Sequence, residues 1–165
     1  MDTSENSKVR RNLTALVEFS RVVNESLDLN FILNNVLFTC MGKFLATKGL
    51  IVLKTDGNFQ LKSSKGISED VLKKFPQISL NGELTEDKSL QSFLKESRLQ
   101  AFEKINSSDE CLGFICLGEK LNQTPYTDDD REFLKTILNI SATAIQNSKV
   151  IEEVKRVNRK LDSRI

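Results

Sequence analysis

Few side chains in this sequence could perform covalent or acid–base chemistry. The 165 residues include three cysteines and no histidine. Without imidazole, histidine-based dyads and triads, haem held by a proximal histidine and mixed cysteine–histidine zinc sites are all excluded. Three thiols are also fewer than the four thiolates of an ordinary iron–sulfur cluster. We therefore expect no catalytic residue and no metal site, which argues against an enzyme.

Each cysteine is predicted to be a structural thiol. Cys40 lies on the apolar stripe of a predicted helix. Cys111 and Cys116 lie five residues apart on a predicted strand, which should direct their side chains to opposite faces of the sheet. Because the N-terminus lacks the apolar core of a signal peptide, free thiols indicate a reducing, cytoplasmic location.

The bulk composition indicates one globular domain. With 24 basic and 23 acidic residues the formal net charge is +1, so no general affinity for nucleic acid is expected. No apolar run approaches the roughly 18 residues of a membrane span, so no membrane insertion is expected. We predict a disordered tail at residues 1–8, a domain at 9–150 and the start of a coiled-coil linker at 151–165.

The order of periodic segments predicts an α+β fold. Helical spacing marks two helices at the start of the domain, and a hairpin with a turn at Asp56–Asn58 follows them. Two more strands precede a long final helix that Thr127 can cap. The expected elements are helices at 9–27 and 29–45, strands at 49–55, 59–66, 99–105 and 111–119, a short helix at 68–75, a brief strand at 78–80, and a loop passing into a helix over 81–97. This order favours an antiparallel sheet with the N- and C-terminal helices on one face.

The final helix carries a seven-residue apolar repeat. A helix that left these side chains in water would forfeit roughly 1.5–3 kcal/mol for each one. A partner helix would cover them, and asparagines facing each other in such a seam fix its register. The predicted seam consists of Ile137, Ile140, Ala144, Asn147, Ile151, Val154, Asn158, Leu161 and Ile165. We therefore predict a homodimer through the N- and C-terminal helices.

Four segments in this order resemble a GAF domain, the small-molecule-sensing module found in front of signalling enzymes. They are FSRVVNESLDLNFILNNVL, GLIVLKTDGNFQLKSSKGIS, LGFICLGEKL and PYTDDDREFLKTILNISATAIQNSKVIEEV, and the resemblance covers residues 13–150. The resemblance implies a regulatory sensor that signals through a dimeric helix to an output domain. That output would be a diguanylate cyclase, a histidine kinase, a phosphatase or a second GAF domain.

A dispersed signature of cyclic-nucleotide-binding GAF domains is matched in part. The family pattern is Asn-Lys, then Phe, then Asp-Glu, and the matching positions are Glu119, Lys120, Tyr126, Asp130 and Arg131. The lysine and the aspartate are kept, the aromatic is a tyrosine, and the other two differ. The match implies a Lys120–Asp130 ion pair that joins the last strand to the exit helix.

The resemblance also implies a ligand pocket on the sheet face away from the long helices. Mapped onto this sequence, the lining is Gly49, Ser64, Lys65, Asn81, Thr85, Lys88, Ser89, Gln91, Ser92 and Asn106. A helix N-terminus near Thr85–Ser89 would offer backbone N–H groups to one phosphate. A cyclic nucleotide, cyclic AMP favoured over cyclic GMP, is the expected ligand, and no other cofactor is expected. The alternative is a dimerisation scaffold with no ligand.

Overall fold

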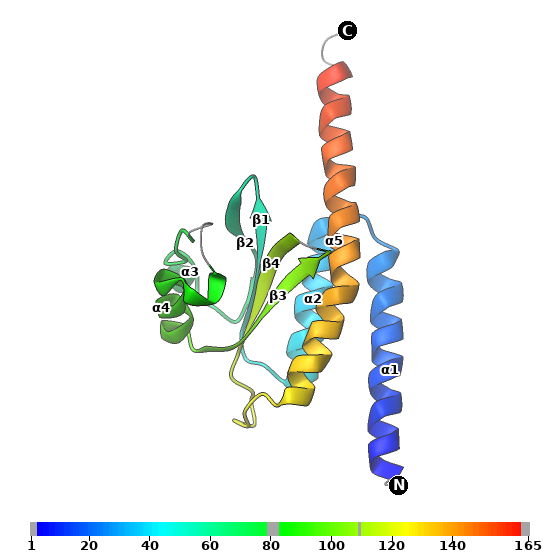
Figure 1. The fold of residues 1–165 in the computed structure, drawn as a ribbon, viewed down its shortest axis with the longest axis vertical. Helices are drawn as coiled ribbons and strands as arrows, with labels where there is room; N and C mark the ends of the chain where they lie inside the picture. The colour runs from blue at the N-terminus through cyan, green and yellow to red at the C-terminus, as the bar shows by residue number, and fades with distance from the viewer. Residues whose placement is uncertain (1–2, 79–82, 109, 163–165) are drawn as a thin grey trace.

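The computed structural model describes residues 3–78, 83–108 and 110–162, and it has the predicted α+β architecture (Figure 1). In chain order the elements are α1 (Thr3–Asn24), α2 (Leu29–Phe44), β1 (Gly49–Thr55), β2 (Asn58–Lys65), α3 (Glu69–Leu72), the 3-10 helix η1 (Leu84–Glu86), α4 (Lys88–Glu96), β3 (Leu99–Ser107), β4 (Glu110–Gly118) and α5 (Asp128–Asp162). The strand predicted at 78–80 falls mostly outside the described residues.

The sheet has the strand order β2-β1-β4-β3, and every neighbouring pair is antiparallel. The β1–β2 hairpin turns at Asp56 and Gly57, whose φ angles are 51° and 81°. Two consecutive positive φ angles are typical of a type I′ turn, whose twist suits a tight hairpin. The predicted turn is therefore confirmed, with glycine at one of the two strained positions.

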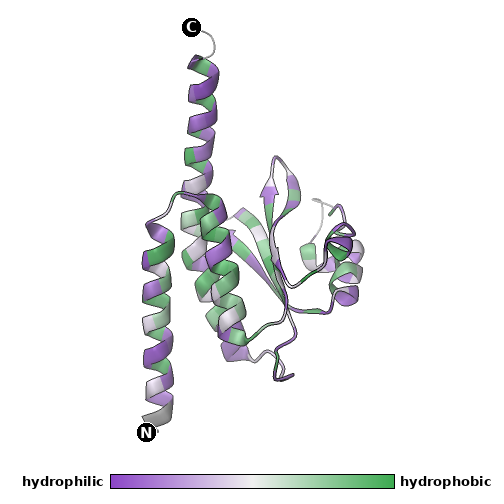
Figure 2. Cartoon of the chain, turned by 180° about the vertical axis from the view of Figure 1, so that it is seen from behind, coloured by the Kyte–Doolittle hydropathy of each residue, from purple (hydrophilic) through white to green (hydrophobic). Residues whose placement is uncertain are grey.

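The helices form layers on both sides of the sheet (Figure 1). α2 and α5 cover one face and bury the larger of two apolar cores, with α1 packed outside them. α3 and α4 lie on the opposite face, over the smaller core. Figure 2 shows that α2 is largely apolar, whereas the projecting end of α5 alternates between apolar and polar residues. The predicted arrangement of the long helices on one face is confirmed.

α2 begins where the sequence predicts. The Asp28 carboxylate accepts hydrogen bonds from the backbone N–H groups of Asn30 (3.0 Å) and Phe31 (3.4 Å), so it caps the helix. The helix ends at Phe44, and the C-cap residue Leu45 adopts the left-handed conformation with φ 54°. The apolar stripe between these ends is buried: Ile32, Leu33, Val36, Leu37, Cys40 and Phe44.

The first helix differs from its prediction. It begins at Thr3 and ends at Asn24, so residues 3–8 of the predicted tail are helical and residues 25–27 are not. Only part of its apolar spacing is used within the protomer, since Phe19 and Val23 are buried in the larger core. Leu16 packs partly against the same core, whereas Val9, Leu13 and Val17 are exposed to solvent.

A β-bulge in the β3–β4 pair overturns the prediction for two cysteines. The register shifts between Ile105 and Asn106, opposite Gly113, which has a φ of 157°. The extra residue reverses the alternation of side chains along β4. Cys111 and Cys116 therefore both contact the smaller core, rather than facing opposite sides of the sheet.

Within the described residues, no helix is long and apolar enough to cross a bilayer.

Candidate functional site

The sheet face under α3 and α4 is where the sequence placed a ligand pocket, and apolar side chains fill it. Leu50 and Val52 of β1 point to this face and are fully buried. They lie in the same buried cluster as Phe114 of β4 and Leu90 and Phe93 of α4. Continuous burial of this kind makes the layer a second hydrophobic core.

Aromatic rings provide much of this second core. Phe114 lies at the centre, with its ring centroid 5.0 Å from that of Phe102 and 5.8 Å from that of Phe59. Phe75 and Phe93 form an edge-to-face pair at 5.3 Å. Such pairs stabilise by about 0.5–1.5 kcal/mol beyond the area that they bury. These ring contacts connect β4 with β2 and β3, and α4 with the segment that follows α3.

Most of the predicted ligand-binding residues lie at the surface. Ser64 is half-buried, and Asn81 lies outside the described residues. The remaining polar positions of the prediction are exposed: Lys65, Thr85, Lys88, Ser89, Gln91, Ser92 and Asn106. The structure brings two of them together, because the Gln91 amide donates a hydrogen bond to the Thr85 carbonyl oxygen.

Thr85 and Gln91 border a small hollow between α4 and β3. Its volume is about 140 Å³, and its other walls are Leu84, Leu90, Leu94 and Phe102. Pockets that enclose drug-sized ligands usually have volumes of about 300–1,000 Å³. The hollow is therefore too small and too apolar for the nucleotide that the sequence predicts.

Gly49 does not belong to this face. A Cβ atom added there would lie 2.7 Å from the Leu37 side chain and 3.1 Å from the Met41 sulfur, both on α2. The residue therefore faces the long helices, and its assignment to the ligand pocket is corrected. Its lack of a side chain instead allows α2 to approach the sheet closely.

The predicted phosphate position is already occupied by a carboxylate. Asp87 precedes α4, and its Oδ1 atom accepts a hydrogen bond from the Leu90 N–H at 2.9 Å. An aspartate at this position satisfies the helix N-terminus and its positive dipole. The same negative charge opposes a phosphate between Thr85 and Ser89.

A second candidate region joins the end of β4 to the start of α5. The Lys120 ammonium lies 2.5 Å from Asp130 Oδ2, which confirms the ion pair that the sequence predicts. Only 10% of the Lys120 side chain and 22% of the Asp130 side chain are exposed. The ammonium also lies 5.1 Å from the centre of the Tyr126 ring and 5.9 Å from that of Phe44. We call this group the β4–α5 junction.

Hydrogen bonds complete the β4–α5 junction. Asp130 Oδ2 accepts the Thr127 N–H at 3.0 Å, and the Asp130 N–H donates to Thr127 Oγ1 at 3.1 Å, which caps α5 as predicted. The Tyr126 hydroxyl donates to the Gly118 carbonyl oxygen at 2.6 Å. Each bond connects the helix start to the strand end or to the turn between them.

The electrostatics of the junction follow from its burial and its bonds. Burial raises the pKa of Asp130, but hydrogen bonds from Lys120 and Thr127 outweigh that effect and hold the pKa below its ordinary value. Burial, reinforced by the negative charge of Asp130, raises the pKa of Tyr126 to about 12. The carboxylate therefore stays charged and the phenol stays neutral near neutral pH.

α5 is fixed to the domain at a second level, further along the helix. The Ser148 hydroxyl donates to the Leu27 carbonyl oxygen at 2.8 Å, in the loop between α1 and α2. The Lys149 ammonium donates to the Lys54 carbonyl oxygen at 2.8 Å, near the β1–β2 turn. Burial lowers the pKa of Lys149. Beyond these contacts α5 projects from the domain, and we call residues 150–162 the stalk (Figure 1).

Part of the predicted dimer seam is buried inside the protomer. Ile137 and Ala144 lie in the larger core, with 0% and 3% of their surfaces exposed, so they cannot meet a partner. The other positions remain accessible or lie outside the described residues. Ile140 and Ile151 are half-buried, Asn147, Val154, Asn158 and Leu161 are exposed, and Ile165 lies outside the described residues.

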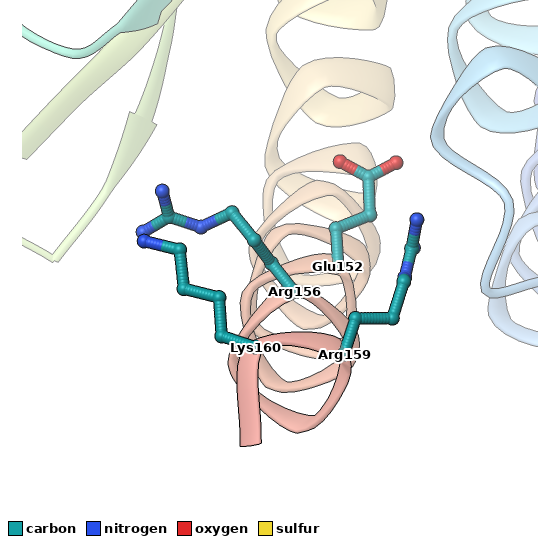
Figure 3. A pocket seen from close by; sticks show the side chains of 4 residues that line it. All are labelled: Glu152, Arg156, Arg159 and Lys160. Atoms are coloured by element: carbon teal, nitrogen blue, oxygen red, sulfur yellow. The ribbon is translucent and has the colours of Figure 1, made fainter. Parts of the chain in front are cut away.

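The side of the stalk opposite the predicted dimer seam is charged. Figure 3 shows Glu152, Arg156, Arg159 and Lys160 extending from this one helix around a shallow hollow. Arg156 also bonds Glu153 at 2.6 Å, and both side chains are largely exposed. Because a single helix lines the hollow, it is a solvated helix surface rather than a built pocket. Among the described residues, no cluster of three or more histidine, cysteine or acidic side chains could hold a metal ion.

Comparison with known proteins identifies the fold. No protein-family model and no curated protein matches the sequence. A similar solved structure is the GAF domain of a protein described as a sensor histidine kinase from Pseudomonas syringae pv. tomato, with a TM-score of 0.69 and 16% identity over 94% of this chain and 99% of that one. The chain has the GAF fold. The GAF domain of an Acinetobacter phosphoenolpyruvate-protein phosphotransferase is also similar, with a TM-score of 0.63 and 12% identity over 92% of this chain and 98% of that one.

A third GAF-like structure carries a ligand. It is a far-red-absorbing protein in its dark state with bound biliverdin, with a TM-score of 0.58 and 10% identity over 82% of this chain and 99% of that one. At these identities the likeness establishes the GAF fold. The ligand belongs to that protein.

Proposed function

We propose that this GAF domain is a homodimeric relay in a signalling protein, with α5 as its output helix. One observation carries the proposal: α5 is fixed to the domain by the β4–α5 junction and by Ser148 and Lys149, and then projects as a stalk with an apolar stripe. A displacement of the sheet would therefore move the base of the stalk. The similar structures, which come from signalling proteins, support this role.

The apolar side chains of the stalk would be stabilised by burial against a partner. Val150, Val154 and Leu161 expose 61%, 52% and 55% of their surfaces. Each such side chain gains roughly 1.5–3 kcal/mol when it is buried. A second copy of the same helix offers a stripe of matching length and spacing. The described part of the protomer leaves Val150, Val154 and Leu161 exposed, so self-association is the simplest way to bury them.

Of the two ligand states that the sequence allows, the geometry favours a relay without a ligand. Cyclic AMP, the ligand favoured by the resemblance, would have to displace Phe102, Leu90 and their neighbours from the second core. It would also have to place its phosphate beside the Asp87 carboxylate. The hollow of about 140 Å³ that α4 and β3 border is too small to hold such a ligand without this displacement.

The mechanism of such a relay is a shift in population between two arrangements of the dimer. A signal shifts this equilibrium only if it stabilises one arrangement of the dimer more than the other. The β4–α5 junction makes the sheet and the first turn of α5 move as one unit. The output domain proposed from the resemblance, such as a diguanylate cyclase, histidine kinase or phosphatase, would receive the change at the end of the stalk.

Sedimentation equilibrium of the purified chain tests the relay. We expect a dimer at micromolar concentration and a single chain after Leu161→Asp, because two charges would meet in the seam. Arg159→Asp is the matched control: it places the same side chain on the charged side of the stalk, and the dimer should persist. A single chain in the unsubstituted protein would refute the proposal.

Thermal unfolding with added nucleotide tests the ligand. A cyclic nucleotide that binds the folded state should add about 2.7 kcal/mol of stability at about a hundredfold excess over its dissociation constant. We expect no shift with cyclic AMP, cyclic GMP or cyclic dinucleotides. A saturating rise with any of them would replace the ligand-free relay with a nucleotide sensor.

A further inference from the structure

The accessible stripe of α5 is not the stripe that the heptad repeat alone suggests. Residues that face away from the sheet recur at alternating steps of three and four. They are Ile140, Thr143, Asn147, Val150, Val154, Val157 and Leu161, and none of them is buried. The side chains at 137, 144 and 148 are all buried in the protomer. From residue 152 to 162 every side chain is exposed, and the same alternating steps, continued along the stalk, fall on the valines and Leu161.

Two seams run along the stalk and share half of their residues. The valine seam contains Val150, Val154, Val157 and Leu161. The asparagine seam, which the heptad repeat predicts, replaces the first and third of these with Ile151 and Asn158. Because successive residues of an α-helix are about 100° apart, the centres of the two seams differ by roughly 50° of rotation.

The two seams differ in chemistry. The valine seam is apolar at every position from 150 to 161, and Val157 is 44% exposed. The asparagine seam has a larger apolar residue in Ile151 but a polar one in Asn158. A buried asparagine lowers the stability of a helix pair while fixing its register. The valine seam is therefore the more stable, and the difference is limited because Val154 and Leu161 serve both.

Asn147 lies on both the accessible stripe and the predicted heptad repeat, just before the stalk. It favours a parallel over an antiparallel pair of helices. In two parallel helices it meets its own counterpart, so the two amides can bond each other. In an antiparallel pair centred on residues 140–161, Asn147 would lie against Val154 of the other helix, with its amide unpaired. The parallel arrangement also leaves both domains at the same end of the stalk.

Two hydrogen bonds attach α5 to the domain just before the stalk begins. Ser148 contacts the loop between α1 and α2, and Lys149 contacts the end of β1. Both bonds are made to backbone carbonyl oxygens of the domain. A displacement of the β1–β2 hairpin relative to that loop would turn α5 about its own axis rather than shift it lengthwise.

We propose that the stalk pairs in parallel with a second copy of the chain along either of these seams. The valine seam is the resting state, and a rotation of roughly 50° leads to the asparagine seam. The inference rests on the proposed dimeric relay and adds the form in which the signal leaves the domain, a rotation of the paired helices.

Disulfide formation between two copies tests the proposal. Val150→Cys probes the valine seam and Ile151→Cys probes the asparagine seam. Cys40 and Cys116 are buried, but Cys111 is half-buried near the start of β4, so both variants also carry Cys111→Ser to leave the introduced cysteine as the accessible thiol. We expect Val150→Cys to form the crosslinked dimer about tenfold faster than Ile151→Cys, a ratio that corresponds to about 1.4 kcal/mol.

A composition-conserving swap provides the decisive variant. The double substitution Val157→Asn with Asn158→Val moves the asparagine from one seam to the other while keeping the same atoms. In that background Ile151→Cys should crosslink faster than Val150→Cys. Helical content measured by circular dichroism checks that each variant is folded.

The outcomes separate this inference from the proposed function. A reversed preference in the swapped chain supports two seams. A dimer in sedimentation whose crosslinking ratio is unchanged by the swap overturns the two-seam proposal and leaves the dimeric relay standing. A single chain in sedimentation overturns both.

Discussion

Lys120 and Asp130 form an ion pair 2.5 Å long between the residues that follow β4 and the first turn of α5. The same carboxylate accepts the Thr127 N–H, so one side chain caps the helix and binds the strand end. The partial match to the cyclic-nucleotide signature is thus explained by a structural role. In this chain the lysine and the aspartate connect the end of β4 to the start of α5.

Asp130→Asn should destabilise the fold. The substitution leaves the Lys120 ammonium, which is 10% exposed, without its anionic partner. Loss of a charged hydrogen-bond partner at a shielded site costs about 1–3 kcal/mol. Urea unfolding measures the loss. Asp129→Asn is the matched control because Asp129 is exposed, and a loss of the same size there would contradict the role assigned to the ion pair.

The junction also predicts how stability depends on pH. Burial raises and hydrogen bonds lower the pKa of Asp130, which ends below its ordinary value of 3.8 in the folded protein. A depressed folded pKa contributes stability that is present above the ordinary value and is lost as the pH falls through the folded value. The difference in unfolding free energy between the unsubstituted chain and Asp130→Asn should therefore shrink below about pH 3.8. A difference that stayed constant down to acid unfolding would refute this linkage.

Gly113→Ala should be severely destabilising. Gly113 has a φ of 157° at the bulge, and a Cβ there would lie 2.0 Å from the Val52 carbonyl oxygen. The clash is with the backbone of the neighbouring strand, so it cannot be relieved by a rotamer change. Gly42→Ala is the control: Gly42 lies in α2, where a Cβ meets no atom within 4 Å. Alanine there should add up to about 1 kcal/mol, because glycine is a poor helix former. Thermal melts compare the two.

The sequence predicts the element order and the long helices well, for identifiable reasons. Asp28 is a strong cap before a helix of apolar spacing, and the Asp56–Gly57 turn requires a hairpin. Both are local signals. The ion pair at the junction came from a resemblance, and the structure confirms it.

The candidate pocket could not be predicted in the same way. Whether Ser89 or Leu90 faces the sheet depends on the rotation of a helix that is only nine residues long. The predicted lining comes from mapping the family's pocket onto this sequence, whereas the spacing of Leu90, Phe93 and Leu94 indicates an apolar inner face for the helix. Likewise, Ile137 and Ala144 fit a heptad repeat but are buried in the larger core of the protomer. The first part of α5 packs on the domain and only its last part projects as the stalk, so one repeat covers two different environments.

Cysteine reactivity provides a test of the bulge and the second core. Burial raises the pKa of the Cys40 thiol to about 12 and also raises that of Cys116. Cys111 is half-buried. Since only thiolates react quickly with disulfide reagents, Cys111 should be labelled first in the folded protein, and the other two only on unfolding. Peptide mass spectrometry identifies the site. Rapid labelling of Cys116 in the folded protein would contradict its burial in the second core.

Hydrogen exchange along α5 tests most directly whether the stalk is paired. A short solvent-exposed helix segment with no partner opens readily and exchanges fast. If residues 150–162 pair with a second copy, their amides should become more protected as the protein concentration rises through the dimer range, while those of residues 133–148 stay protected throughout. Fast exchange of residues 150–162 at every concentration would contradict the account.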